Sequence, residues 1–143
     1  MIDADIVTLI IARTRSSRLP GKIFLTIRPE INILEQTIIQ VKEGSFSKTA
    51  LLFDENSPSK IAKSISNKYK IDFYRGNENP TKRIVDYLKG LKKLPKFFIR
   101  VTADNPLLSI EALSKLKEVA KSNAHEKNID YFSFPDLLPG TKP

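Results

Sequence analysis

Residues 12–22 carry the side chains in this chain that are best suited to bind phosphate. Four cations lie within this stretch, which contains no acidic residue: Arg13, Arg15, Arg18 and Lys22. The Pro20-Gly21 pair predicts a fixed turn directly before Lys22. The preceding run, 6–11, is apolar and rich in β-branched residues, which predicts a buried strand. The carboxyl end of such a strand is where α/β proteins usually bind phosphate, although a solvated basic turn has the same composition.

The loop is not a P-loop of the Walker A type. Ser16 stands where that motif needs glycine, and Ile23 replaces the Ser or Thr that would contact magnesium. If the loop binds phosphate, it does so through its cations.

Strand and helix signals alternate along the chain and predict one α/β domain over residues 1–143. The expected strands are 6–11, 49–53, 71–74, 97–101 and 129–134. Asn32 and Glu35 form a capping-box pattern that begins the first helix, and Gly44 is expected to end it. Later helices are expected to begin at Ser57-Pro58, Asn79-Pro80 and Ser109, with inward-facing stripes that include Ile61, Ile65, Ile84 and Val85. The expected architecture is a three-layer, Rossmann-like fold with a mostly parallel sheet.

Asp104 follows the fourth expected strand and is the second candidate site residue. If three strands wind one way and the fourth returns beside the first, the strand order is 3-2-1-4-5. That order places the basic loop and Asp104 on either side of the switch point. A lone carboxylate opposite a phosphate loop suits a magnesium–nucleotide complex, because magnesium takes few protein carboxylates. Asp104-Asn105-Pro106 is also common chemistry for a helix-initiating turn, so both interpretations remain open.

Composition narrows the class of partner. The 143 residues have a net charge of +8, which favours anionic partners, and 41% of them are hydrophobic, enough for a core. No apolar stretch is long enough for a membrane span, and the chain has no cysteine, so we expect no membrane partner and a cytoplasmic setting. A nucleic-acid-binding module is the alternative, supported by Lys89, Lys92, Lys93 and Lys96. That cluster lacks interleaved aromatic residues for base stacking.

The stretch Ala12-Arg13-x-x-Ser16-Ser17-Arg18-Leu19-Pro20-Gly21-Lys22 resembles the signature of sugar-activating cytidylyltransferases. The resemblance is to the spore coat polysaccharide biosynthesis protein F group and the 3-deoxy-manno-octulosonate cytidylyltransferases. Further stretches agree in order and spacing: 74–78 with Arg83 in the next helix, 100–107, and Asp130-Tyr131. The resemblance implies the nucleotide-diphospho-sugar transferase fold and a role in polysaccharide biosynthesis.

At matching positions, the resemblance also implies roles. Arg13 and Lys22 would hold the phosphates of CTP, with Arg18 supporting the loop and Asp104 binding Mg²⁺. The same motif brings Ala12, Ser16 and Gly21 into the nucleotide-binding set, and Arg75-Gly76 would lie on the nucleotide side of the cleft. The implied reaction converts CTP and a sugar to a CMP-sugar and pyrophosphate.

The chain also departs from the family pattern. Thr14-Arg15 replaces small residues, often glycine, and the segment 27–32 replaces the usual Gly-Lys-Pro connection. Relatives continue beyond the position of Gly140 with the part that supplies most of the sugar pocket, a further acidic metal ligand and dimer contacts. We therefore expect a fragment of a longer protein, or a C-terminally shortened or inactive relative. It should bind nucleotide, turn over sugar poorly and expose an apolar edge after the strand 129–134 that favours a homodimer. A scaffold domain that keeps the fold without turnover is a further alternative.

Overall fold

The computed structural model describes residues 3–15, 18–45, 47–123 and 130–133. Its elements are β1 (Asp3–Ala12), a 3-10 turn η1 (Lys22–Phe24), β2 (Thr26–Arg28), β3 (Ile31–Asn32), α1 (Ile33–Ser45), β4 (Ser47–Asp54), α2 (Lys60–Tyr69), β5 (Asp72–Gly76), α3 (Pro80–Lys89), β6 (Phe97–Thr102) and α4 (Ile110–Ser122).

Four parallel strands form the central sheet in the order β5-β4-β1-β6. This is the expected order 3-2-1-4, and it makes the gap between β1 and β6 the switch point. The fifth strand expected over residues 129–134 is not seen at 130–133, which have no strand pairing, and its two end residues lie outside the described ranges. The sheet built from the described residues therefore ends at β6.

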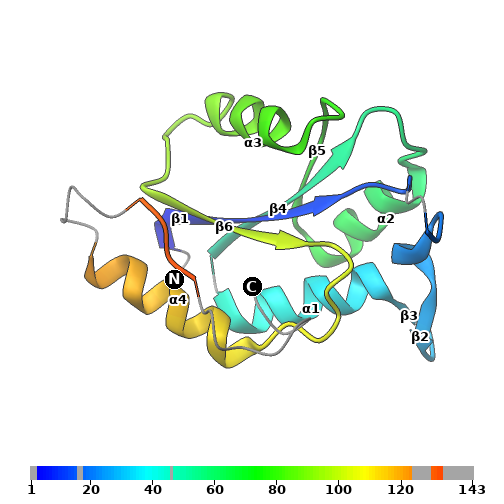
Figure 1. Ribbon diagram of the computed structural model, residues 1–143, viewed down its shortest axis with the longest axis horizontal. Helices are drawn as coiled ribbons and strands as arrows, with labels where there is room; N and C mark the ends of the chain where they lie inside the picture. The colour runs from blue at the N-terminus through cyan, green and yellow to red at the C-terminus, as the bar shows by residue number, and fades with distance from the viewer. Residues whose placement is uncertain (1–2, 16–17, 46, 124–129, 134–143) are drawn as a thin grey trace.

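Helices cover the two faces of the sheet unequally (Figure 1). Side chains of α1, α2 and α4 join one core with alternate residues of β1, such as Ile6 and Ile10. On the opposite face, α3 is the one described helix that packs, over Val7 and Leu9 of the same strand. Because α3 contacts β4 and β5, no helix of the described residues covers the same face of β6, and Phe98, Arg100 and Thr102 are exposed there.

The expected capping box of α1 is confirmed. The Glu35 N–H donates to Asn32 Oδ1 at 2.9 Å, and the Asn32 N–H donates to Glu35 Oε2 at 3.1 Å. The expected starts at Asn79 and Ser109 are confirmed too, because each side chain accepts a hydrogen bond from a backbone N–H of its helix. Such caps satisfy donors that have no partner inside the helix.

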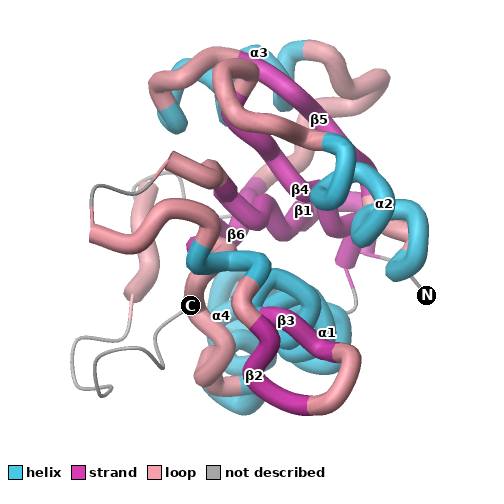
Figure 2. Tube along the Cα trace, turned by 90° about the vertical axis from the view of Figure 1, so that its right-hand side faces the viewer, coloured by secondary structure: helices cyan, strands magenta, loops and turns pink. Residues whose placement is uncertain are grey.

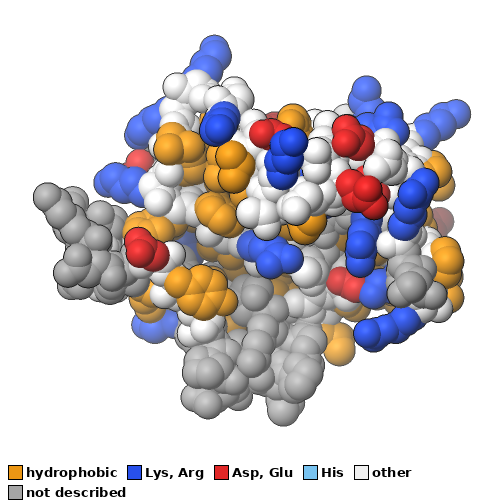
Figure 3. Space-filling model, turned by 45° about the horizontal axis from the view of Figure 1, so that its top comes forward, with side chains coloured by type: hydrophobic (Ala, Val, Ile, Leu, Met, Phe, Trp, Pro, Cys, Tyr) orange, Lys and Arg blue, Asp and Glu red, His pale blue; other side chains and the backbone are white. Residues whose placement is uncertain are grey.

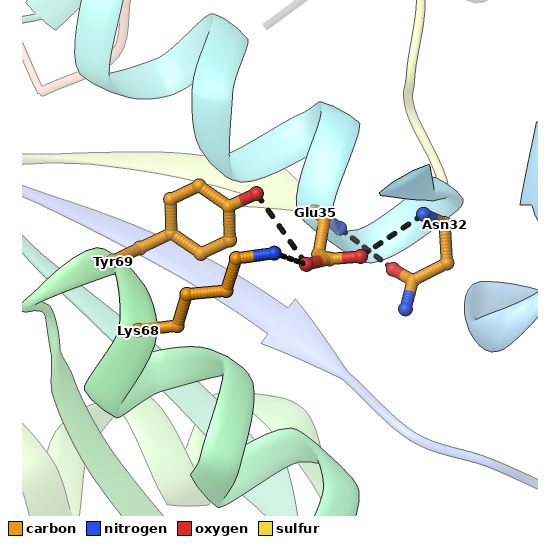
Figure 4. A network of polar contacts seen from close by, with 4 residues as sticks. All are labelled: Asn32, Glu35, Lys68 and Tyr69. Carbon is orange, nitrogen blue, oxygen red and sulfur yellow. Dashed lines mark hydrogen bonds and ion pairs between the residues drawn. The ribbon is translucent and has the colours of Figure 1, made fainter. Parts of the chain in front are cut away.

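Glu35 also joins α1 to the end of α2 (Figure 4). Its Oε1 accepts hydrogen bonds from Lys68 Nζ at 2.8 Å and from the Tyr69 hydroxyl at 3.4 Å. Burial alone would raise the pKa of the Glu35 carboxyl. The hydrogen bonds from Lys68 and the Asn32 backbone, with the Lys68 charge, outweigh burial and hold this pKa below its usual value.

The start expected for the second helix, at Ser57-Pro58, is wrong, because α2 begins at Lys60 with Ser59 as its N-cap residue. Ser57 instead donates its hydroxyl to Asp54 Oδ2 in the turn after β4.

Three further local expectations are wrong. Helix α1 continues past Gly44 to Ser45, and Gly44 serves for close packing, because a Cβ there would lie 3.0 Å from the Ile110 carbonyl oxygen. Ile61 and Val85 are exposed, at 56% and 41%, although each was expected to face the core. Helical spacing alone does not show how wide the covered stripe is.

The segment 27–32 forms a short β2–β3 hairpin beside the start of α1, as Figure 2 shows. The Ile33 N–H donates to the Leu25 carbonyl at 3.0 Å and ties the hairpin to that helix. Among the described helices, none has the length and apolar character needed to cross a membrane.

Candidate functional site

A cavity of about 330 Å³ lies at the carboxyl ends of β1 and β6, at the switch point. The loop after β1, the end of β6 and the start of α3 all contribute to its wall. Its lining residues are Ile11, Ala12, Arg13, Arg15, Lys22, Ile23, Glu78, Pro80, Arg83, Arg100, Thr102, Ala103 and Asp104. Figure 3 looks toward the face that carries α3, where Lys and Arg side chains are widely spread.

The loop after β1 is closed by a backbone hydrogen bond at its base. The Gly21 N–H donates to the Thr14 carbonyl at 2.9 Å, which brings Lys22 back toward the end of β1. Gly21 has φ of 70°, in the left-handed region that a side chain would strain. The Pro20-Gly21 pair therefore makes the turn that the sequence predicts, and η1 begins directly after it.

A buried pair at the end of β4 and in the turn after it anchors the same loop. Ser57 Oγ donates to Asp54 Oδ2 at 2.9 Å and accepts from the Thr14 N–H at 3.2 Å. Asp54 and Ser57 are each 1% exposed, so this connection is held inside the protein. The sequence gives no direct signal for this contact between Ser57 and Thr14, because the Ser57-Pro58 pattern predicts only the start of a helix.

Lys22 and Asp104 are in contact, as the expected strand order requires. Lys22 Nζ forms an ion pair with Asp104 Oδ2, and the two side chains are 38% and 34% exposed. Partial burial alone would raise the pKa of the Asp104 carboxyl, but the hydrogen bond and charge of Lys22 lower it below its usual value. Asp104 is therefore held as a carboxylate on the cavity wall.

The lining is strongly cationic. Its five Lys and Arg side chains outnumber the carboxylates of Glu78 and Asp104. Arg100 belongs to the stretch 100–107 that resembles the family, which does not by itself place it at the site. Its position at the cavity follows from the alternation of side chains along β6. Its neighbours Ile99 and Val101 are buried on the α1 face, so Arg100 faces the cavity side. A cavity with this balance attracts anions.

The structure does not bring every predicted site residue to the cavity. Among the described residues, Arg18 and Gly21 belong to the loop without lining the cavity, and Ser16 lies outside the described ranges. Arg75 Nη2 instead donates to the carbonyls of Glu55, at 2.5 Å, and Ser57, at 3.4 Å. Arg75 thus ties β5 to the turn after β4, and its contact with nucleotide stays a prediction.

Gly76 is likewise absent from the described lining. A Cβ at Gly76 would lie 2.5 Å from Tyr74 Cε1, so glycine is required there by close packing. Its carbonyl accepts from the Glu55 N–H at 2.8 Å. The nucleotide-side role implied for Gly76 also stays a prediction.

A parallel sheet with a cationic cavity at its switch point defines a protein of the nucleotide-binding α/β class. Comparison with known proteins narrows this class. The chain belongs to the cytidylyltransferase family, whose sequence profile matches residues 7–135.

The chain is also similar to individual proteins and solved structures. A cytidylyltransferase from Leptospira borgpetersenii is 26% identical, with a TM-score of 0.74 over 85% of this chain and 50% of that one. A CMP:2-keto-3-deoxy-manno-octonic acid synthetase complexed with CTP shares the fold, with 18% identity and a TM-score of 0.70 over 84% of this chain and 48% of that one. An uncharacterized protein of Methanocaldococcus jannaschii, MJ1063, is 28% identical over 94% of this chain and 54% of its own length. The chain thus spans about half the length of these relatives.

Proposed function

We propose that this chain binds CTP and forms the nucleotide-binding part of an enzyme that transfers a cytidylyl group to a sugar. The observation that carries the proposal is the meeting of Lys22 and Asp104 at the switch point, beside Arg13. Family membership and the solved CTP complex of a protein with the same fold support CTP as the nucleotide.

The cavity supplies positioning and positive charge, which is what this reaction needs. A sugar oxygen attacks the α-phosphorus of CTP, and the bond from that phosphorus to the oxygen bridging toward the β-phosphate breaks. Pyrophosphate leaves with the electron pair, and the proton of the sugar hydroxyl passes to solvent. Arg13 and Lys22 would hold the phosphates and stabilise the charge that develops on them.

Magnesium fits this site only together with the nucleotide. The described residues contain no group of three or more His, Cys, Asp or Glu side chains that could hold a metal ion. Asp104 offers one partly exposed carboxylate, and magnesium is commonly bound by one or two carboxylates plus substrate phosphates. Asp104 would hold the ion, which would neutralise phosphate charge.

The acceptor and the biological setting extend the proposal. A keto-deoxy sugar acid is the first acceptor class to test, by analogy with the synthetase that shares the fold. A role in polysaccharide biosynthesis, a homodimer and a cytoplasmic setting belong to the same proposal.

The nucleic-acid alternative gains no support from the lysine cluster. Lys93 and Lys96 form ion pairs with Asp5 at 3.2 and 3.5 Å, so part of the cluster's charge is already paired within the protein. A short stretch of lysines at a helix end is ordinarily a solvated face.

Calorimetric titration with CTP, UTP, ATP and a short oligonucleotide, each with and without Mg²⁺, tests the proposal. We expect CTP to bind most tightly and its affinity to rise with Mg²⁺. If millimolar CTP gives neither heat nor a shift in melting temperature, the CTP assignment is wrong. Oligonucleotide binding that falls steeply with salt, with no preference for CTP, would favour the nucleic-acid module instead.

A further inference from the structure

Arg83 is buried as deeply as the core side chains, yet two of its guanidinium nitrogens have no hydrogen-bond partner among the described residues. The residue is 1% exposed, lies in the first turn of α3 and lines the cavity. Its Nε and Nη1 atoms are buried and form no hydrogen bond with any described residue. Leaving buried donors unpaired costs stability, so a chain that keeps them is expected to use them for something else.

The opposite charge that acts most strongly on Arg83 does not satisfy these donors. Asp54 attracts Arg83 electrostatically, but its carboxylate oxygens are engaged elsewhere. Oδ1 accepts from the Asn56 N–H at 2.8 Å, and Oδ2 accepts from Ser57 Oγ at 2.9 Å. Asp54 therefore bonds within the turn that anchors the loop after β1, and it forms no hydrogen bond with Nε or Nη1 of Arg83.

A second cation lies close to Arg83. Burial lowers the pKa of the Arg83 guanidinium, and the charge of Arg13 lowers it further, while Asp54 and Glu55 oppose the change. Arg13 and Arg83 both line the cavity, so the loop after β1 and helix α3 each bring an arginine to the same space. An anion placed between them would relieve this repulsion.

We propose that Arg83 and Arg13 together hold one phosphate group of the bound nucleotide. This inference deepens the proposed function and rests on it for the identity of the nucleotide. Phosphate oxygens match the geometry of guanidinium donors, and their charge neutralises both arginines. A carbonyl oxygen of the base would satisfy the donors of Arg83 but, being neutral, would leave the repulsion between Arg13 and Arg83 in place.

A purely structural arginine and a ligand-binding one respond differently to Arg83→Met. Methionine keeps an unbranched apolar chain and removes the buried charge with its unpaired donors. Since Arg83 makes no bond that methionine would break at Nε or Nη1, we expect the ligand-free variant to melt at the wild-type temperature or above it. Its anion affinity should fall.

The test uses tripolyphosphate, CTP and UTP as probes, with affinities from calorimetry and melting temperatures from a thermal scan. The matched control is Arg28→Met, which removes the same charge from the β2–β3 hairpin, where Arg28 Nε donates to Gln36 Oε1 at 2.9 Å. We expect Arg83→Met to lower the affinities for tripolyphosphate and for CTP by a similar factor, about tenfold or more. Arg28→Met should change either affinity by less than about twofold.

The remaining outcomes separate the inference from the proposed function. Unchanged tripolyphosphate affinity in Arg83→Met overturns the inference, and a lowered melting temperature with unchanged affinity would assign Arg83 a structural role. A loss confined to CTP would place Arg83 at the base, which also overturns it. If tripolyphosphate binding depends on Arg83 but CTP binds no more tightly than UTP, the phosphate contact of Arg83 is supported and the CTP assignment is wrong.

If the wild type does not bind tripolyphosphate, the proposal that Arg83 and Arg13 hold a phosphate group is wrong.

Discussion

At the scale of single residues, the ion pair between Lys22 and Asp104 determines which bond must break when nucleotide and metal bind. The two groups that the proposal assigns to phosphate and to metal are bonded to each other. Each side chain must leave its partner in order to bind phosphate or metal. The ion pair therefore keeps both side chains at the cavity and lowers the apparent affinity of Lys22 for phosphate and of Asp104 for metal. Removing either partner should therefore have a distinct effect.

Lys22→Ala should weaken CTP binding by about 1.5–3 kcal/mol, the usual value of a hydrogen bond to a charged group. Asp104→Asn should instead leave CTP binding without metal unchanged or stronger, because Lys22 is then free, and should abolish the gain on adding Mg²⁺. Titrations with and without Mg²⁺ measure both effects. The control is Lys63→Ala, an exposed lysine on α2. An unchanged affinity in folded Lys22→Ala would remove Lys22 from the site.

Much of the site could be predicted from residue order, and the part that could not depends on side-chain direction. Lys22 and Asp104 meet because a parallel sheet with a switch point leaves few alternatives for the ends of its strands. Arg83 lies in a stretch that matches the family, yet only the packing of α3 on the sheet shows that its Nε and Nη1 are buried without a partner among the described residues. The anchoring of Thr14 by Ser57 is hidden from the sequence for the same reason.

At the scale of elements, local chemistry predicts where helices begin better than where they end. Asn32, Asn79 and Ser109 cap their helices through contacts within a few residues, which the sequence displays directly. Gly44 fails as a helix end because its role is set by α4, a partner far along the chain. The β2–β3 hairpin was missed because its strands are too short to show alternation.

The bond network of Glu35 should make the joining of α1 to α2 dependent on pH. Because the pKa of Glu35 is lower in the folded state than in the unfolded chain, its contribution is present above the unfolded value. The contribution is lost as pH falls through the folded value. Glu35→Gln keeps a capping-box residue and removes the charge. We expect it to lower the free energy of unfolding at pH 7, with a gap from wild type that closes toward pH 3.

Urea denaturation at the two pH values measures this gap. Glu118→Gln is the control, because Glu118 pairs with Lys115 on the surface, where both side chains are more than half exposed and an ion pair contributes little. A gap for Glu35→Gln that is equal at pH 3 and pH 7 would contradict the role given to its charge.

At the scale of the whole molecule, the cavity is walled unevenly. The loop after β1, the end of β6 and α3 surround the proposed phosphate positions, while the open face of β6 borders the cavity with Phe98 45% exposed and with Arg100 and Thr102 exposed. No described element covers that face. Exposed apolar residues there and nearby in the sequence, including Leu94 at 66%, are the surface on which a homodimer would be expected to form.

Because the described residues surround the proposed phosphate positions but leave one side of the cavity open, we expect the 143-residue chain to bind CTP well and to transfer the cytidylyl group slowly. The proposed phosphate contacts all come from described residues, but a sugar beside the open face of β6 would be held by few groups and exposed to water. Every 1.4 kcal/mol of transition-state stabilisation lost in this way slows the reaction about tenfold. Pyrophosphate release from CTP, measured with a keto-deoxy sugar acid and Mg²⁺, should therefore be slow even when CTP is saturating. Rapid, sugar-dependent release by the monomeric chain would show that its acceptor site is already complete.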